Sequence, residues 1–157
     1  MSKVNFFRKI LIKLFSKKLP AFYKNKPILI ITTESNWNET PRIRHQIALE
    51  LSKSYNIIFI QLWQNKNYKD IFINDSLYVT SAGFKLKGLN KFSHILPIFF
   101  HLHRFYVAEK IYFLLEQLKQ KCTGIINFNF DFPHLFYRIN NVKKIYICND
   151  DFLSIVA

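Results

Sequence analysis

A chain of 157 residues, half of them hydrophobic, is long enough for one domain with a buried core, and this composition excludes an intrinsically disordered protein. Its three glycines, Gly83, Gly88 and Gly124, are too few and too scattered for a glycine-rich phosphate loop of the dinucleotide-binding or P-loop kind. The formal net charge is +13, and residues 1–26 contain no Asp or Glu. A basic end of this kind suits an anionic partner such as a lipid surface or a nucleic acid.

Residues 3–19 have the pattern of an amphipathic helix that ends before Pro20. Apolar side chains on one face and lysines on another are typical of a helix in a membrane interface. Packing of the apolar face on the protein body, or a disordered arm, would also fit. We therefore expect residues 1–26 to form a basic amphipathic helix and linker. The candidate membrane-contact residues are Phe7, Lys9, Leu11, Lys13, Leu14, Phe15 and Lys17.

The next third of the chain predicts a strand, a helix and a second strand. Residues 28–32 are a short apolar run, which is typical of a strand buried on both faces in a parallel sheet. A polar loop follows, and Thr40 with Pro41 predicts a helix start, since threonine caps free N–H groups and proline suits the first position. Residues 56–62 form the second buried strand. Together these elements predict a right-handed crossover unit.

The rest of the chain continues the alternation of strands and helices. The further predicted elements are short strands at 76–81 and 84–86, a long helix at 95–120, a strand at 124–128, a short helix at 131–139 and a strand at 144–148. We therefore expect residues 27–157 to form one α/β domain, an open, mostly parallel Rossmann-like sheet with flanking helices. In such folds ligands bind beyond the carboxyl ends of the strands.

The polar loop after the first strand holds three candidate binding residues. Trp37 could stack on a sugar ring or a lipid, or it could anchor the loop. Arg42 lies in the first turn of the predicted helix, where the helix N-terminus already favours anions, so it could grip a phosphate or carboxylate. The alternative for Arg42 is a surface ion pair. His45 could act as a base, but a lone histidine is more often a hydrogen-bonded structural residue.

Three aspartates near the ends of later strands are further candidates. Asp131 begins a predicted short helix, where it could bind a ligand or cap the helix. Asp150 and Asp151 end the last strand and could bind a sugar hydroxyl, a metal or a base. The side chains of neighbouring strand residues point to opposite sides of the strand, so these two carboxylates are not oriented to bind one metal ion together. We expect no metal or other cofactor, and we expect the chain's cysteines, Cys122 and Cys148, to be free thiols.

Several motifs, in the same order, resemble the N-terminal domain of bacterial glycosyltransferases of the GT-B fold, group 1-like. The first is the run from Pro41 to Ser52, which contains Arg42, Arg44 and His45, followed by a strand at 55–60. The later ones are Asp131-Phe132-Pro133 and the segment 144–152, which contains Asp150 and Asp151. The resemblance covers about residues 28–153.

The resemblance implies a domain that holds the acceptor, while a second such domain binds the nucleotide-sugar donor. Trp37, Arg42, His45, Asp131, Asp150 and Asp151 would then line this half of the cleft. Since the 157 residues hold no donor domain, we expect the chain to be inactive alone. We expect a nucleotide sugar to be a partner only if a second domain is supplied.

The expected function is the acceptor-side half of a glycosyltransferase for cell-envelope polysaccharide or glycolipid, with a lipid-linked or glycan acceptor. We expect it to lie at the inner face of the cytoplasmic membrane, in contact with anionic lipid. The alternative is a non-catalytic α/β interaction module at the membrane surface. Nucleic-acid binding is disfavoured, because the basic residues cluster in one predicted helix whose pattern suits a lipid surface. The sequence also contains no nucleic-acid recognition motif.

Overall fold

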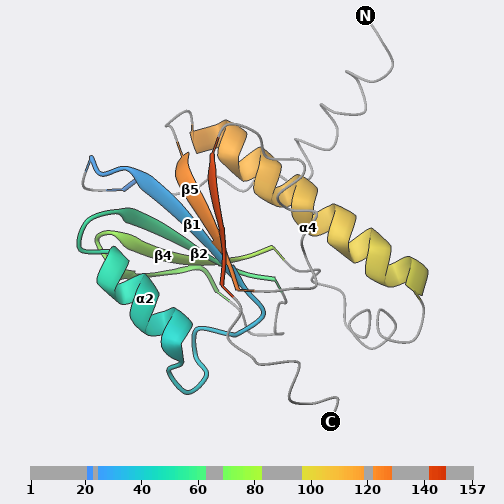
Figure 1. Ribbon diagram of the computed structural model, residues 1–157, viewed down its shortest axis with the longest axis horizontal. Coiled ribbons are helices and arrows are strands. Elements are labelled where there is room, and N and C mark those ends of the chain that lie inside the picture. Colours follow the sequence, from blue (N-terminus) through green and yellow to red (C-terminus); the bar gives the residue numbers. More distant parts are fainter. Residues whose placement is uncertain are drawn as a thin grey trace, which may run out of the picture.

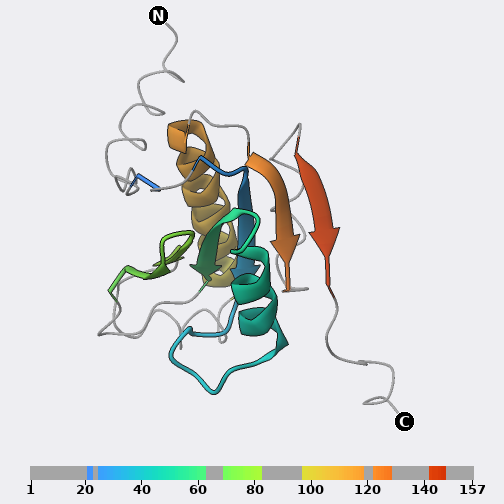
Figure 2. The ribbon, with the colours of Figure 1, turned by 90° about the vertical axis from the view of Figure 1, so that its left-hand side faces the viewer.

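The computed structural model describes residues 21–22, 25–62, 69–82, 97–118, 122–128 and 142–147. In these residues the chain forms a mixed, mostly parallel six-stranded sheet with a helix against each face (Figures 1 and 2). The elements are β1 (Ile28–Thr33), α2 (Ile43–Leu51), β2 (Asn56–Gln61), β3 (Ile71–Asn74), β4 (Leu77–Ser81), α4 (Pro97–Leu118), β5 (Cys122–Asn127) and β6 (Lys143–Tyr146). The predicted α/β class and the mostly parallel sheet are confirmed.

The strand order is β3-β4-β2-β1-β5-β6, and β3 is antiparallel to β4 while the other neighbours are parallel. The chain therefore moves outward from β1 in two directions, first through β2 and β4 and then back across to β5 and β6. All the parallel strands end at the same edge of the sheet, which we call the C-terminal rim. Figure 2 shows β5 and β6 as arrows that point toward this edge.

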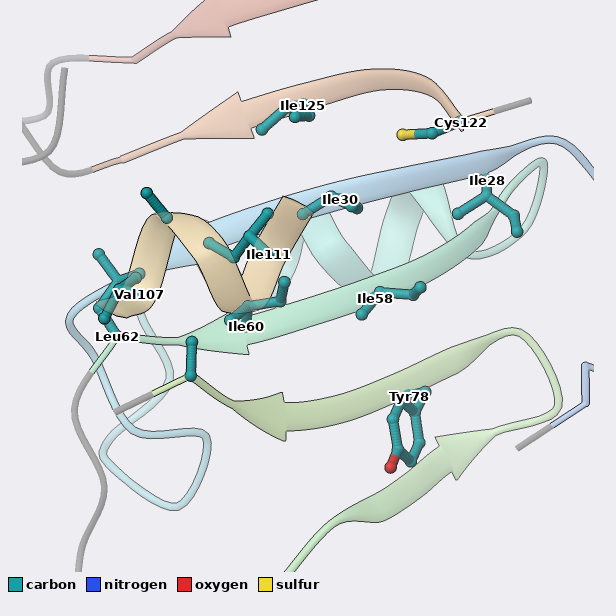
Figure 3. Close-up of a cluster of buried hydrophobic side chains, with 12 residues drawn as sticks. Ile28, Ile30, Ile58, Ile60, Leu62, Tyr78, Val107, Ile111, Cys122 and Ile125 are labelled. Atoms are coloured by element: carbon teal, nitrogen blue, oxygen red, sulfur yellow. The ribbon is translucent and has the colours of Figure 1, made fainter. Parts of the chain in front are cut away.

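The core has two layers, one on each face of the sheet. Alternate residues of β2 divide between them: Ile58 and Ile60 pack toward α4, whereas Ile57 and Phe59 pack toward α2. The α4 layer also contains Val107 and Ile111 and is drawn in Figure 3 with the strand side chains that it covers. Both central strands are buried, as their apolar runs predict.

β3 is the described strand that sequence reasoning missed. It lies at the edge of the sheet and is mostly exposed, so it lacks the buried run that marks the central strands. The Oδ1 of Asn74 accepts a hydrogen bond from the N–H of Ser76 at 2.9 Å, which closes the turn into β4. Phe72 packs on Tyr78 at 5.0 Å between ring centroids. Phe72 is therefore explained by a partner strand, whereas Ile73 is partly buried and packs against the α2 layer.

Lys26, at the end of the basic N-terminal segment, takes part in the fold itself. Its Nζ donates to the carbonyl oxygens of Ser52 and Lys53, at 2.9 and 2.8 Å, and to Ser76 Oγ at 3.1 Å. A cation at the C-terminal end of α2 satisfies carbonyl groups that the helix leaves open and complements its dipole. This lysine thus joins the end of α2 to the turn before β4.

Several predicted features fall outside the described residues. These are the amphipathic helix at 3–19 with its membrane-contact candidates, the strand at 84–86 and the short helix at 131–139. Among the residues that the structure does describe, no helix is both long enough and apolar enough to cross a bilayer.

Candidate functional site

Polar side chains gather at the C-terminal rim on the side of α2. Thr33 of β1, Gln61 of β2 and Ser81 of β4 are partners in the parallel register, and all three are buried. They follow the apolar part of each strand and point to the same face, since each lies two residues beyond a residue that packs toward α2. The Oε1 of Gln61 has no hydrogen-bond partner among the described residues. Gln61 and Thr33 were not among the sequence-based candidates.

The loop from Glu34 to Arg42 lies over this polar row. Its first turn is fixed by Ser35, whose N–H donates to Thr33 Oγ1 at 3.1 Å. Its second is fixed by Glu39, whose Oε1 accepts from the backbone N–H of Asn36 at 3.1 Å and from its Nδ2 at 3.0 Å. The loop is therefore held by its own polar side chains.

The pKa of Glu39 reflects these contacts and the charge around the loop. Burial alone would raise it, but the hydrogen bonds from Asn36 and the charges of Arg42 and Arg44 outweigh burial and lower the pKa below its usual range. Glu39 is therefore ionised at neutral pH. Its negative charge partly offsets the two cations at this end of α2.

His45 holds the start of α2 and is buried. Its Nδ1 accepts the N–H of Arg42 at 3.0 Å, so this nitrogen carries no proton. Its Nε2 lies 3.1 Å from the carbonyl oxygen of Asn36, an acceptor, and so this nitrogen must carry the proton and donate. Both ring nitrogens are therefore engaged within the protein, and this geometry fits the structural alternative for His45 better than a base.

Trp37 packs edge-on against two rings of the α2 layer. The centroid distances are 4.9 Å to Phe59 and 5.0 Å to His45, and His45 in turn stacks on Phe59 at 5.6 Å. Aromatic contacts of this kind add to the free energy of burial. The indole is partly buried, so it anchors the loop and still leaves part of its surface exposed.

Two arginines occupy the N-terminal end of α2. Arg42 is the N-cap, with extended backbone angles of φ −114° and ψ 171°, and its side chain is exposed. The helix thus begins two residues later than Thr40 and Pro41 predict. Arg44 is partly buried, and its Nη1 donates to Thr33 Oγ1 at 3.2 Å. Arg44 was part of the motif in the sequence but not a candidate, because only the fold places it on the strand end.

The opposite face of the rim joins β1 to β5. Thr32 Oγ1 donates to Asn127 Oδ1 at 2.9 Å, and both residues are completely buried. This bond lies between the strands from which the chain moves outward in opposite directions, the place where open α/β sheets bind ligands. It fixes the spacing of β1 and β5 at their carboxyl ends.

We expect Thr32→Val to lower the free energy of unfolding by about 1–3 kcal/mol, because the buried Asn127 Oδ1 would lose its Thr32 donor. Urea unfolding of both proteins measures the difference. Thr123→Val is the matched control: its hydroxyl donates to Ile28 O at 2.9 Å across the same two strands, but Thr123 is exposed. An equal loss of unfolding free energy in the two variants would show that burial of the Thr32–Asn127 hydrogen bond adds nothing to its contribution to stability.

The three remaining candidates are the aspartates that follow β5 and β6 in the chain. Asp131, Asp150 and Asp151 lie outside the described residues, although β5 and β6, which precede them, end on the C-terminal rim. In the described part of the chain no group of three or more His, Cys, Asp or Glu side chains is placed to hold a metal ion. His101 is exposed and His103 is buried on the same helix, so the two do not share a face.

The rim therefore combines a helix N-terminus, an exposed guanidinium and a second guanidinium fixed on a strand hydroxyl. This arrangement can bind an anion through charge-assisted hydrogen bonds. Comparisons of this chain with models of protein families, with curated proteins and with solved structures gave no match.

Proposed function

We propose that this chain is the acceptor-binding half of a glycosyltransferase of the GT-B kind that works in the synthesis of cell-envelope polysaccharide or glycolipid. In this proposal the C-terminal rim receives the phosphate of a lipid-linked acceptor, at the inner face of the cytoplasmic membrane. The nucleotide sugar would be bound by a second domain. The chain alone would bind acceptor but transfer no sugar.

The observation that carries the proposal is the position of Arg42 and Arg44 at the N-terminus of α2. The first N–H groups of a helix have no acceptor within the helix, and the helix dipole favours negative charge there. Arg44 is oriented by Thr33 Oγ1, so less side-chain freedom is lost when it binds a ligand. A phosphate or diphosphate that links a sugar to a lipid has the charge and geometry that these groups recognise.

The order of the parallel strands supports a Rossmann-like assignment. Among the described strands, β4-β2-β1-β5-β6 runs outward from β1 as in dinucleotide-binding domains, with β3 added at one edge. Such domains bind ligands where the order reverses, here between β1 and β5. The sequence resemblance over about residues 28–153 supports the same assignment and would bring Asp131, Asp150 and Asp151 to this rim.

The proposal is tested by titrating the purified chain with a short-chain polyprenyl diphosphate that carries one sugar, and separately with a nucleotide sugar. We expect binding of the first and no turnover of the second. Arg44→Gln and Arg42→Gln should each weaken binding by about 10- to 100-fold, because each removes a charge-assisted bond of about 1.5–3 kcal/mol. Thermal unfolding of each variant separates lost binding from lost folding.

Lys53→Gln is the matched control, since the side chain of Lys53 is exposed near the other end of α2 and forms an ion pair with Glu50, one turn earlier. If it weakens binding as much as Arg44→Gln, the effect is net charge and not the rim. Sugar transfer by the isolated chain would contradict the proposal. Vesicle binding without affinity for the lipid-linked sugar would instead favour a non-catalytic interaction module at the membrane.

A further inference from the structure

The N-terminal half of α4 exposes apolar side chains along one face. Ile98, Leu102 and Phe105 are 65%, 52% and 53% exposed, and their spacings of four and three residues bring them onto one stripe. We call these three residues the α4 stripe. Farther along the helix, Val107 and Ile111 are buried against the sheet. This helix is thus apolar on both sides, whereas a surface helix normally presents polar residues to water.

The α4 stripe overhangs the C-terminal rim. Val107 packs beside Leu62, which directly follows the end of β2, and Ile111 packs beside Ile60 (Figure 3). Lys110 Nζ donates to the carbonyl oxygen of Ser81, the last residue of β4, at 3.0 Å. The turns of α4 before these contacts therefore extend past the strand ends. Figure 2 shows this end of α4 on the same side as the loop before α2.

The charge around the stripe has one sign. From Pro97 to Ala108 the helix contains no acidic residue, and its permanently charged side chain is Arg104, while His103 is buried. The first acid along the helix is Glu109, which is buried. With a net charge of +13, a second copy of the chain would be repelled, whereas an anionic lipid surface would be attracted.

We propose that the α4 stripe is a membrane-contact surface, which lies in the headgroup region of an anionic bilayer with the helix along the surface. The stripe supplies the apolar contact and the basic charge supplies the attraction to anionic headgroups. This places the C-terminal rim at the bilayer surface, where the headgroup of a membrane lipid can reach Arg42 and Arg44. The contact requires neither the glycosyltransferase function nor the predicted helix at 3–19.

Membrane depth is the direct test. Phe105→Trp places an indole on the stripe, and Leu49→Trp places one at an exposed apolar position of α2, on the opposite face of the sheet. Each variant is mixed with phosphatidylcholine and phosphatidylglycerol vesicles that carry brominated acyl chains, and its fluorescence is compared with that of the parent chain. We expect bromine to quench the emission of the indole added by Phe105→Trp and not that of the indole added by Leu49→Trp. Equal behaviour of the two would overturn the proposal, including the case in which residues 1–26 alone hold the protein on the vesicle.

Affinity is the second measurement, by co-sedimentation with the same vesicles. We expect Ile98→Ser/Leu102→Ser/Phe105→Ser to bind about 10- to 100-fold more weakly, because apolar area no longer leaves water. The control is Leu49→Ser at the exposed apolar position of α2, away from the rim, which should bind like the parent. Unchanged binding of the triple variant would overturn the proposal. So would a dimer of the parent chain that the triple variant converts to a monomer, because the stripe would then be a contact between copies.

Discussion

Replacing Phe59 by alanine is expected to destabilise the protein by about 3–5 kcal/mol, the range for removing a large buried aromatic side chain. Phe59 lies on the central part of β2, is 0% exposed and packs in the α2 layer with Ile57 and Val79. Its ring also contacts the rings of Trp37 and His45. The cavity would therefore open directly beneath the loop that carries the candidate site. Denaturant unfolding followed by circular dichroism measures the loss.

The same substitution is expected to loosen the loop before α2. Trp37 packs on Phe59 and His45 stacks on it, so both anchors lose their contact when the ring is removed. His45 holds Asn36 and Arg42 through its two nitrogens, and a displaced imidazole would release both. We therefore expect weaker binding of the lipid-linked sugar in addition to lower stability.

Ile58→Ala is the matched control for Phe59→Ala. Ile58 is the neighbouring residue of β2 and is equally buried, but it faces α4. We expect a loss of about 2–5 kcal/mol with little change in ligand affinity under conditions where the protein stays folded. If both variants lose affinity to the same extent, the α2 layer has no special role in shaping the rim. Phe59→Leu, which conserves most of the volume, should cost less than about 1.5 kcal/mol.

The central sheet was predictable because its signal is local. β1 and β2 are uncharged strands rich in isoleucine, and short apolar runs of this kind are typical of strands buried on both faces. The alternation of these runs with helical stripes then fixes the α/β class. β3 gives no such signal, since its residues are mostly exposed and its pairing depends on the turn at Asn74 and Ser76.

The site was only partly predictable because its geometry is set by contacts distant in sequence. Trp37, Arg42 and His45 were predicted as candidates from residue type and position, and the fold brings all three to one rim. The role of His45 depends on Asn36 and Phe59, which no local pattern connects to it. Thr33, which orients Arg44, and the Thr32–Asn127 bond follow only from strand register. The three aspartates stay predictions.

Acid is expected to destabilise the protein through His103 on α4. The side chain is 1% exposed, and burial lowers its pKa to about 4 from the usual 6.5. Between these two values the unfolded chain binds a proton that the folded protein does not. The free energy of unfolding therefore falls as the pH drops from 6.5 to 4, and this contribution is fully present above pH 6.5. Each pH unit is worth about 1.4 kcal/mol, so we expect a loss of roughly 3 kcal/mol.

His103→Leu removes the titrating group and replaces it with a side chain of similar volume. The quantity measured is the difference in unfolding free energy between parent and variant, obtained by urea unfolding from about pH 7 to about pH 4. The carboxylates titrate in both proteins and largely cancel, whereas the His103 contribution remains in the difference. His101→Leu is the matched control, because it removes an exposed imidazole from the same helix, and an equal effect of the two substitutions would mean that burial of His103 is not the cause. A difference between parent and His103→Leu that stays constant over this range would mean that the imidazole is protonated as readily in the folded protein as in the unfolded chain. The buried position of His103 against the sheet would then be wrong, and with it the side of α4 that faces the core.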